Sequence, residues 1–252
     1  MEYPIPPKEI LYPLYSVHEL RRPFSLIGKG LNLESLYNKN KVLYKIFSKE
    51  RKFETNPRIA EIPLTLYYLG KYKISPPAKI LDVGHLESLL PYFLSSIGFD
   101  CIGIDIREQK IIIKGAEIKT YQQDICKFSP EIKFDAVTCI STLEHIGLGY
   151  GDEMENSKDK EALNKIYQLL KPLGLLFLSV PMSEKFRVIE NFERHYSLEK
   201  FSDLITSSGF KILERKYIIK NCDFWKVSED FSQLQKEDTF VGFLCLKRWK
   251  NE

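Results

Sequence analysis

The chain has no apolar run that approaches the ~20 residues of a membrane-spanning helix. Its first residues, Met-Glu-Tyr-Pro-Ile-Pro-Pro, lack the basic start and apolar stretch of a secretory signal. The formal net charge of +3 is too close to neutral to indicate nucleic-acid binding by itself. From these three absences we expect a cytoplasmic protein that inserts no segment into a membrane.

The spacings typical of metal sites and redox pairs are missing as well. The 4 histidines form no H-x-x-x-H pair, and the 5 cysteines form no C-x-x-C pair. Three of the cysteines lie in apolar, strand-like runs, where reduced core thiols are the ordinary outcome. We therefore expect neither a metal ion nor a disulfide framework.

What the sequence does contain is the composition of a globular protein, with 44% hydrophobic and 28% charged residues among 252. From residue 78 onward, strand-like and helix-like periods alternate, which predicts a mostly parallel, doubly wound α/β sheet. The expected strands lie near 79–83, 101–105, 117–122, 135–140, 174–180, 211–219 and 239–246. The expected helices lie near 87–97, 159–171 and 198–208.

Residues 1–77 have a different character. Prolines preclude a long helix at their start, whereas 31–51 and 58–72 have helical periodicity, and Ser75-Pro-Pro77 ends the segment. We expect 1–77 to form a helical cap packed on the core and 78–252 to form the core itself. The apolar residues expected near one face of the second helix are Ile59, Ile62, Leu66 and Leu69.

The most informative stretch is Lys79-Ile-Leu-Asp-Val-Gly-His-Leu-Glu-Ser88, an apolar strand followed by a glycine turn into a helix. Such a turn forms a cradle for a cofactor. A dinucleotide fingerprint needs no carboxylate there, because the helix start receives a pyrophosphate. Asp82 therefore favours a ligand that carries positive charge. The apolar residues spaced as a buried helix face are Leu86, Leu89, Leu90, Phe93, Leu94 and Ile97.

Two further acids follow at the ends of expected strands. Asp105 ends the second strand, about 20 residues beyond the turn, where a carboxylate can hold two ribose hydroxyls. Asp124 ends the segment expected as the third strand. Since open α/β sheets bind ligands at the carboxyl ends of their strands, Asp82, Asp105 and Asp124 are predicted to surround one site.

In this order the motifs resemble those of the class I S-adenosylmethionine-dependent methyltransferases. Ile80-Leu-Asp-Val-Gly84 resembles the first family motif, 134–145 resembles the fourth strand with its Leu-Glu-His tail, and 169–181 resembles the helix, turn and fifth strand. The resemblance implies a Rossmann-like seven-stranded sheet in the order 3-2-1-4-5-7-6 with the last strand antiparallel. Residues 87–91, 144–152 and 194–197 look like a little-characterised methyltransferase-like group linked with cell-surface glycan pathways.

The resemblance also implies S-adenosylmethionine as the cofactor, with Asp82 at the methionine amino group, Asp105 at the ribose and Asp124 on the adenine side. The turn departs from the family pattern G-x-G-x-G, since Leu86 and Ser88 replace its second and third glycines. We interpret this as a weakened motif, and an inactive cofactor-binding subunit stays open as an alternative. The other residues expected at the cofactor are Val83, Gly84, His85, Ile106, Ile125 and Ser141.

Glu144 and His145 follow the fourth expected strand, where a doubly wound sheet opens its substrate crevice. A hydroxyl acceptor profits from a base that removes its proton, and the ordinary histidine pKa of ~6.5 suits that role. His145 is therefore the leading candidate for a base, with Glu144 beside it and His195 as a second candidate. A wall of the substrate pocket is the alternative role for His145.

Taken together, the motifs favour an O-methyltransferase that acts on a sugar, a glycan or another small hydroxylated metabolite. The alternative acceptor is RNA or a protein, which the basic segment 39–52 would contact, although a solvated helix face explains that segment better. Association into a homodimer is left open.

Overall fold

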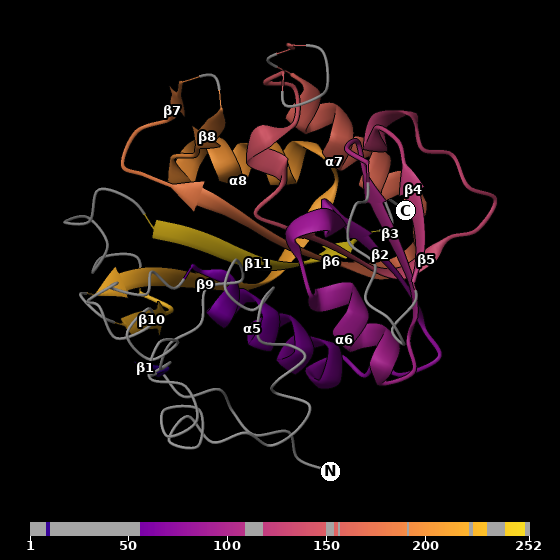
Figure 1. Cartoon of the computed structure of the whole chain (residues 1–252). Coiled ribbons are helices and arrows are strands. Elements are labelled where there is room, and N and C mark those ends of the chain that lie inside the picture. The colour runs from indigo at the N-terminus through magenta and orange to yellow at the C-terminus, as the bar shows by residue number, and fades with distance from the viewer. Residues whose placement is uncertain are drawn as a thin grey trace, which may run out of the picture.

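The structure is a computed structural model that describes residues 9–10, 56–108, 118–149, 154–155, 157–190, 192–221, 224–230 and 240–249. Within these residues one sheet of nine strands runs through the molecule (Figure 1). In spatial order its strands are β1 (Glu9–Ile10), β10 (Phe224–Ser228), β9 (Phe210–Asn221), β11 (Phe240–Arg248), β6 (Leu170–Met182), β5 (Phe134–Ile140), β2 (Lys79–Val83), β3 (Asp100–Asp105) and β4 (Lys119–Gln122).

The strand order confirms the sequence prediction for the seven expected strands. From β4 to β9 the order is β4-β3-β2-β5-β6-β11-β9, which is 3-2-1-4-5-7-6, and β11 is antiparallel to both of its neighbours. The predicted number of strands was wrong, because β10 and β1 extend the edge beyond β9 by antiparallel pairing. Strand β1 has only 2 residues, too few to show an alternating pattern.

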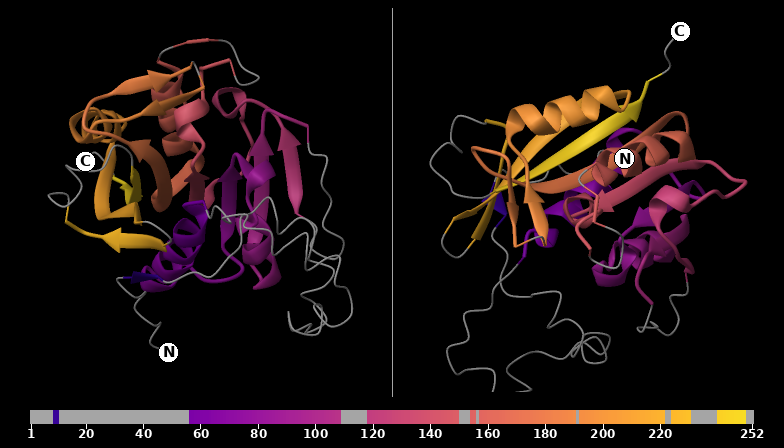
Figure 2. Two further views of the ribbon diagram at one scale, coloured as in Figure 1. Left: turned by 60° about the vertical axis from the view of Figure 1, so that its left-hand side comes forward. Right: turned by 90° about the horizontal axis from the view of Figure 1, so that it is seen from above.

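Among the described residues, four helices cover the two faces of the sheet. In Figure 1, α5 (Arg58–Lys71) and α6 (Leu90–Ser96) lie on one face, while α7 (Lys158–Leu169) and α8 (Leu198–Ser207) lie on the other. Figure 2 shows the same layers from two further directions, with α8 lying along β11 in the right-hand view. The layers are those expected of a doubly wound α/β fold.

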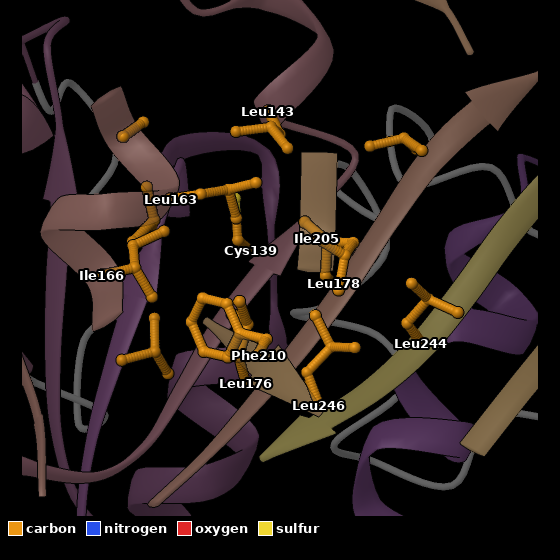
Figure 3. Packing of buried hydrophobic residues seen from close by; sticks show 14 of the residues in the cluster. Cys139, Leu143, Leu163, Ile166, Leu176, Leu178, Ile205, Phe210, Leu244 and Leu246 are labelled. Atoms are coloured by element: carbon orange, nitrogen blue, oxygen red, sulfur yellow. The ribbon is translucent and has the colours of Figure 1, made fainter. Parts of the chain in front are cut away.

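Side chains of the central strands are buried on both faces. In β6, Leu176 and Leu178 pack beneath α7 and α8, whereas Phe177 points to the opposite core under α5. Figure 3 shows the first of these cores, where Ile166 of α7 and Ile205 of α8 meet the strands. Burial on both faces explains why β6 reads as an almost continuous apolar run.

The ends of α8 and α7 follow local chemistry. The predicted cap is confirmed, because Ser197 Oγ accepts the Lys200 N–H at 3.2 Å, and Gly209 ends the helix with a φ of 83°. Helix α7 ends at Leu169, two residues earlier than predicted, and Leu170 already belongs to β6. Pro172 explains the earlier end, since a proline disfavours helical backbone in the residues before it.

The helix expected over 87–97 is shorter and its buried face is narrower. The turn continues as a 3-10 helix, η1 (His85–Glu87), and α6 begins only at Leu90. Leu90 and Leu94 are fully buried, but Phe93 is 44% exposed and Ile97 is 57% exposed, which contradicts the predicted six-residue face. A helix of 7 residues presents little more than one i, i+4 pair to the sheet.

Helix α5 also differs from its predicted orientation. Its buried residues are Ala60, Glu61, Leu64, Thr65, Tyr68 and Leu69, so the buried face is rotated away from Ile59, Ile62 and Leu66, which are only partly buried. Burial of the charged residue Glu61 was not predicted, and its role emerges in the site below.

The N-terminal part of the chain is described only in pieces. The expected helix 31–51 and the basic segment 39–52 lie outside the described residues. Strand β1 pairs with β10, and α5 packs on the same sheet as the core helices. The division into a cap of residues 1–77 and a core of residues 78–252 stays a proposal.

Four cysteines, Cys101, Cys126, Cys139 and Cys245, are buried and free of disulfide bonds, whereas Cys222 lies outside the described residues. Over the described part of the chain, none of the helices has both the length and the apolar character needed to cross a membrane.

The two cores lead to a prediction for stability. Phe243 in β11 is fully buried and its ring stacks on Tyr68 with centroids 6.1 Å apart. Phe243→Ala should lower the free energy of unfolding by about 3–5 kcal/mol, because the structure cannot fill the cavity left behind. Phe93→Ala is the matched control, since the same substitution at an exposed ring should cost less than about 1 kcal/mol. Urea unfolding measures both, and equal losses would contradict the assigned core.

Candidate functional site

A pocket of about 140 Å³ opens at the carboxyl ends of β2, β3, β4 and β5. This is the edge at which open α/β sheets bind their ligands. Two of its walls come from elsewhere, because Arg58 belongs to α5 and Phe192 to the hairpin of β7 (Arg187–Ile189) and β8 (Glu193–His195). The remaining lining residues are Val83, Gly84, Ile104, Asp105, Ile106, Arg107, Gln123, Asp124, Ile125, Ser141, Thr142, His145 and Ile146.

Gly84 brings the ends of β2 and β5 together. Its φ of 80° lies in the left-handed region, and its N–H donates to the Ile104 carbonyl at 2.8 Å. A Cβ at this position would lie 2.2 Å from Thr142 Oγ1. The first glycine of the motif is therefore required both by backbone conformation and by the approach of Thr142.

Ser141, just beyond β5, connects the pocket to α5. Its φ of 45° is unusual for a residue with a side chain, and its N–H donates to Ser179 Oγ at 3.0 Å. Its hydroxyl donates to Glu61 Oε1 at 2.9 Å, while Arg58 Nη1 donates to the Ile140 carbonyl at 3.1 Å. The first turn of α5 thus forms part of the pocket wall.

Three carboxyl groups are buried around these elements, namely Glu61, Asp82 and Glu144, each at most 2% exposed. Asp82 Oδ1 accepts the Thr138 hydroxyl, and one oxygen of each of the three groups has no hydrogen-bond partner among the described residues. Burial raises the pKa of Asp82 to about 7 and raises the pKa values of Glu61 and Glu144, whereas the charge of Arg58 opposes all three shifts. A bound cation would favour the ionised form of these acids.

Asp105, at the end of β3, is buried and paired within the chain. Its Oδ1 accepts the Arg107 backbone N–H at 2.9 Å and Arg107 Nε at 3.0 Å, and its Oδ2 accepts Arg107 Nη2 at 3.0 Å. The side chain of Asp105 is 4% exposed, against 32% for Arg107. The expected ribose-binding acid therefore lines the pocket, and its carboxylate is paired with the Arg107 guanidinium, a contact that no sequence pattern indicates.

Asp124 lines the pocket and also caps η2 (Ile125–Lys127), accepting the Cys126 N–H at 2.9 Å. Its other oxygen lies 3.1 Å from the ammonium of the buried Lys158. Burial alone would raise the pKa of Asp124, but the Cys126 N–H and Lys158 together hold it below its ordinary value. Asp124 is therefore an ionised acid with a structural role at the pocket wall.

His145, in η3 (Leu143–His145), is oriented by the β7–β8 hairpin. Its Nδ1 lies 2.7 Å from the Phe192 carbonyl, and the two rings pack with centroids 4.8 Å apart. A carbonyl only accepts, so Nδ1 carries the proton and Nε2 keeps its lone pair in the neutral ring. Burial lowers the pKa of His145 below its ordinary 6.5, and the charges of Arg107 and Arg58 act in the same direction.

Glu144 and His195 do not line the pocket. Glu144 Oε1 lies 3.9 Å from His145 Nε2, too far for a hydrogen bond, and burial favours the neutral form of both groups, so they form no ion pair. His195 is buried and its Nε2 lies 2.7 Å from Glu193 Oε1. Their catalytic assignment stays a hypothesis, now with His145 as the better placed candidate.

Arg194, on β8, fixes the loop that carries His145. It is 1% exposed, and its Nη1 donates to the carbonyls of Ile146 at 2.6 Å and Glu144 at 3.4 Å. Its Nε lies 3.9 Å from the Asp159 carboxylate. The role of Arg194 is thus positional: a buried guanidinium holds the backbone on both sides of the candidate base.

The structure brings together most of the residues predicted for the site. Val83, Gly84, Asp105, Ile106, Asp124, Ile125, Ser141 and His145 line the pocket. Asp82 lies behind it, and His85 packs on Gly103, where a Cβ would approach its ring to 2.6 Å. No sequence pattern indicated the other lining residues, which are Arg58, Ile104, Arg107, Gln123, Thr142, Ile146 and Phe192. No group of three metal-ligating side chains occurs among the described residues.

The chain is similar in sequence to known methyltransferases. The sequence model of a methyltransferase domain matches residues 57–214. A protein of Geobacillus sp. (strain WCH70) named as a methyltransferase is 29% identical over 125 residues, 46% of this chain and 48% of its own length. The chain thus spans about half the length of that curated relative.

Two solved structures share the fold. The 1,6-didemethyltoxoflavin-N1-methyltransferase of Burkholderia thailandensis, solved with S-adenosylhomocysteine, is 14% identical, with a TM-score of 0.55 over 96% of this chain and 94% of its own. An S-adenosylmethionine-dependent methyltransferase of Clostridium acetobutylicum ATCC 824 is 14% identical, with a TM-score of 0.56 over 85% of this chain and 100% of its own. At this identity the likeness is one of fold.

The burial of Asp82 predicts how stability changes with pH. The unfolded carboxyl has a pKa of ~3.9, so between about pH 4 and 7 the folded state holds a proton that the unfolded state has lost. The free energy of unfolding should therefore fall as the pH rises through this window, by up to about 1.4 kcal/mol per pH unit from this group, and level off above it.

Asp82→Asn should remove that contribution and give a flatter profile in urea unfolding measured across the window. Asp100→Asn is the control, because it makes the same substitution at a side chain that is 48% exposed. Parallel profiles for the wild type and Asp82→Asn would show that Asp82 does not titrate in the folded protein near neutral pH.

Proposed function

The chain belongs to the methyltransferase domain family whose sequence model matches residues 57–214, and on that premise we propose that it transfers a methyl group from S-adenosylmethionine to a hydroxyl of a small acceptor, such as a sugar. The observation that carries the proposal is a pocket that joins the glycine turn, the strand-end acid Asp105 and a histidine whose Nδ1 is held by the Phe192 carbonyl.

The residues that line the pocket, and the buried acids behind it, fit this cofactor. Its ammonium and sulfonium groups are cationic, and the buried carboxyls Glu61 and Asp82 each keep an oxygen without a hydrogen-bond partner among the described residues. Asp105 would hold the ribose hydroxyls, and Ile106 and Ile125 provide apolar walls for an adenine ring. When bound, S-adenosylmethionine supplies a methyl group on a positively charged sulfur, which is open to attack by a nucleophile.

His145 would act on the acceptor. The Phe192 carbonyl holds its Nδ1–H, so Nε2 can take the proton of a hydroxyl group placed in the pocket. Its lowered pKa keeps the ring neutral, and thus basic, near neutral pH. Phe192, 45% exposed beside this histidine, offers an apolar surface on which the ring of a small acceptor can lie.

The acceptor class can be tested directly. The protein is incubated with S-adenosylmethionine labelled at the methyl group and with cell extract separated by size. Label in the small-molecule fraction supports the proposal, whereas label in RNA or protein would replace it with the alternative acceptor. Cofactor binding without transfer to any fraction would instead favour an inactive subunit.

Cofactor binding gives the first prediction from the proposed function. Calorimetry should show that the protein binds S-adenosylhomocysteine and that Asp105→Ala weakens binding at least ~10-fold, about 1.4 kcal/mol, because the ribose loses its acceptor. Asp135→Ala is the control, since Asp135 lies at the start of β5 and is paired with Lys171 outside the pocket. Failure to bind, with NAD bound in its place, would overturn the cofactor assignment.

The second prediction concerns His145. His145→Gln should keep the affinity for S-adenosylhomocysteine and lower the rate ~10²–10⁴-fold, the range for loss of a general base. The wild-type rate should fall on acidification through a pKa below 6.5, and the variant should lack this fall. A near-normal rate, or an unchanged pH profile, would assign His145 to the pocket wall.

A further inference from the structure

The ion pair between Asp105 and Arg107 engages the carboxylate that is proposed to hold the cofactor ribose. Arg107 approaches Asp105 with three donors, its backbone N–H, Nε and Nη2, at 2.9–3.0 Å. Both carboxylate oxygens are engaged, and both residues line the pocket. The pair therefore lies in the path of a ligand and not on a remote surface.

The number of hydrogen bonds that Asp105 can accept decides whether a ribose can bind beside Arg107. A carboxylate offers roughly four lone-pair sites, two on each oxygen. Arg107 fills both sites of Oδ1 and one of Oδ2, which leaves a single site. A ribose presents two hydroxyl donors, so it cannot bind through both of them while the guanidinium stays in place.

Both ribose hydroxyls can bind Asp105 if the Arg107 guanidinium moves away, even when the rest of Arg107 stays in place. The Arg107 backbone N–H keeps its bond to Oδ1, and roughly three sites become free for the two hydroxyls. The Arg107 side chain is 32% exposed, whereas that of Asp105 is 4% exposed at the strand end. Of the two groups, the guanidinium is therefore the one with open space into which it can rotate.

We infer that Arg107 sets the cofactor affinity of this protein by competing with the ribose hydroxyls for Asp105. The inference rests on the proposed function, because it takes S-adenosylmethionine as the ligand. Each binding event exchanges an internal ion pair for two ligand hydrogen bonds. The apparent affinity is then the intrinsic affinity multiplied by the fraction of molecules in which the guanidinium does not occupy Asp105.

Calorimetric titration with S-adenosylhomocysteine tests the inference. Arg107→Ala should bind this ligand about 3–10-fold more tightly than the wild type, because the competitor is gone. Arg107→Lys should lie between the two, since an ammonium cannot form the forked contact of a guanidinium. Weaker or unchanged binding by Arg107→Ala would overturn the inference and make Arg107 a contributor to the cofactor site.

A double-mutant cycle tests whether Arg107→Ala changes the affinity through Asp105 or through other contacts. In an Asp105→Asn background, Arg107→Ala should give no gain in affinity, because the charged acceptor for which the two compete is absent. A gain that persists in this background would show that Arg107 acts through other contacts, and the inference would fail.

The number of ligand hydroxyls provides an independent measurement. Arg107→Ala should improve the binding of adenosine more than that of 2′-deoxyadenosine, since one hydroxyl fits the site that remains beside the guanidinium. In the wild type, the Arg107 Nε–H resonance should shift when S-adenosylhomocysteine is added. Equal gains for the two nucleosides, or an unmoved resonance at saturation, would contradict displacement.

These outcomes separate the inference from the proposed function. If the wild type and Arg107→Ala both fail to bind S-adenosylhomocysteine, the cofactor assignment falls and the inference falls with it. If the wild type binds and Arg107→Ala binds no more tightly, only the inference fails.

Discussion

The pocket depends on the close approach of Gly84 and Thr142. A Cβ on Gly84 would lie 2.2 Å from Thr142 Oγ1, and the φ of 80° at this residue is one that side chains disfavour. The approach allows the turn after β2 to lie against the turn after β5, so that the ends of the two central strands share one cavity. Strand pairing places the turns in register, since Val83 lies opposite Cys139.

Elements outside the sheet then complete the pocket. Helix α5 contributes Arg58 and the buried Glu61, and the β7–β8 hairpin contributes Phe192, whose carbonyl orients His145. The same hairpin carries Arg194, which holds the backbone around the candidate base. The electrostatic character follows from burial: acids behind the glycine turn favour a cationic ligand, while a histidine of lowered pKa remains neutral in front of it.

The sequence predicted the parts of this arrangement that rest on local patterns. Alternating periods predicted the doubly wound sheet, and the family resemblance implied the order of its seven strands. Ser197 and Gly209 marked the ends of α8, and the acids at strand ends led to Asp105 and Asp124, which line the pocket. The predictions for the sheet layers and for the ends of α8 are confirmed, because they depend on periods and turn residues that lie close together in the sequence. The predictions for Phe93 and Ile97 failed, because periodicity does not show how many turns a sheet can cover.

The sequence by itself determined a doubly wound fold with a glycine turn and acids at the strand ends. Strand periods, helix periods and turn residues can all be recognised from residues that are close together in the chain. Only the tertiary structure decided that Glu61 is buried against Ser141, that Phe192 holds His145, and that Arg107 occupies Asp105. Two of these contacts join segments 80 and 47 residues apart, whose proximity follows from packing on a common sheet. The third joins near neighbours, but a guanidinium has many rotamers, and only the shape of the pocket selects the one that turns back onto the acid.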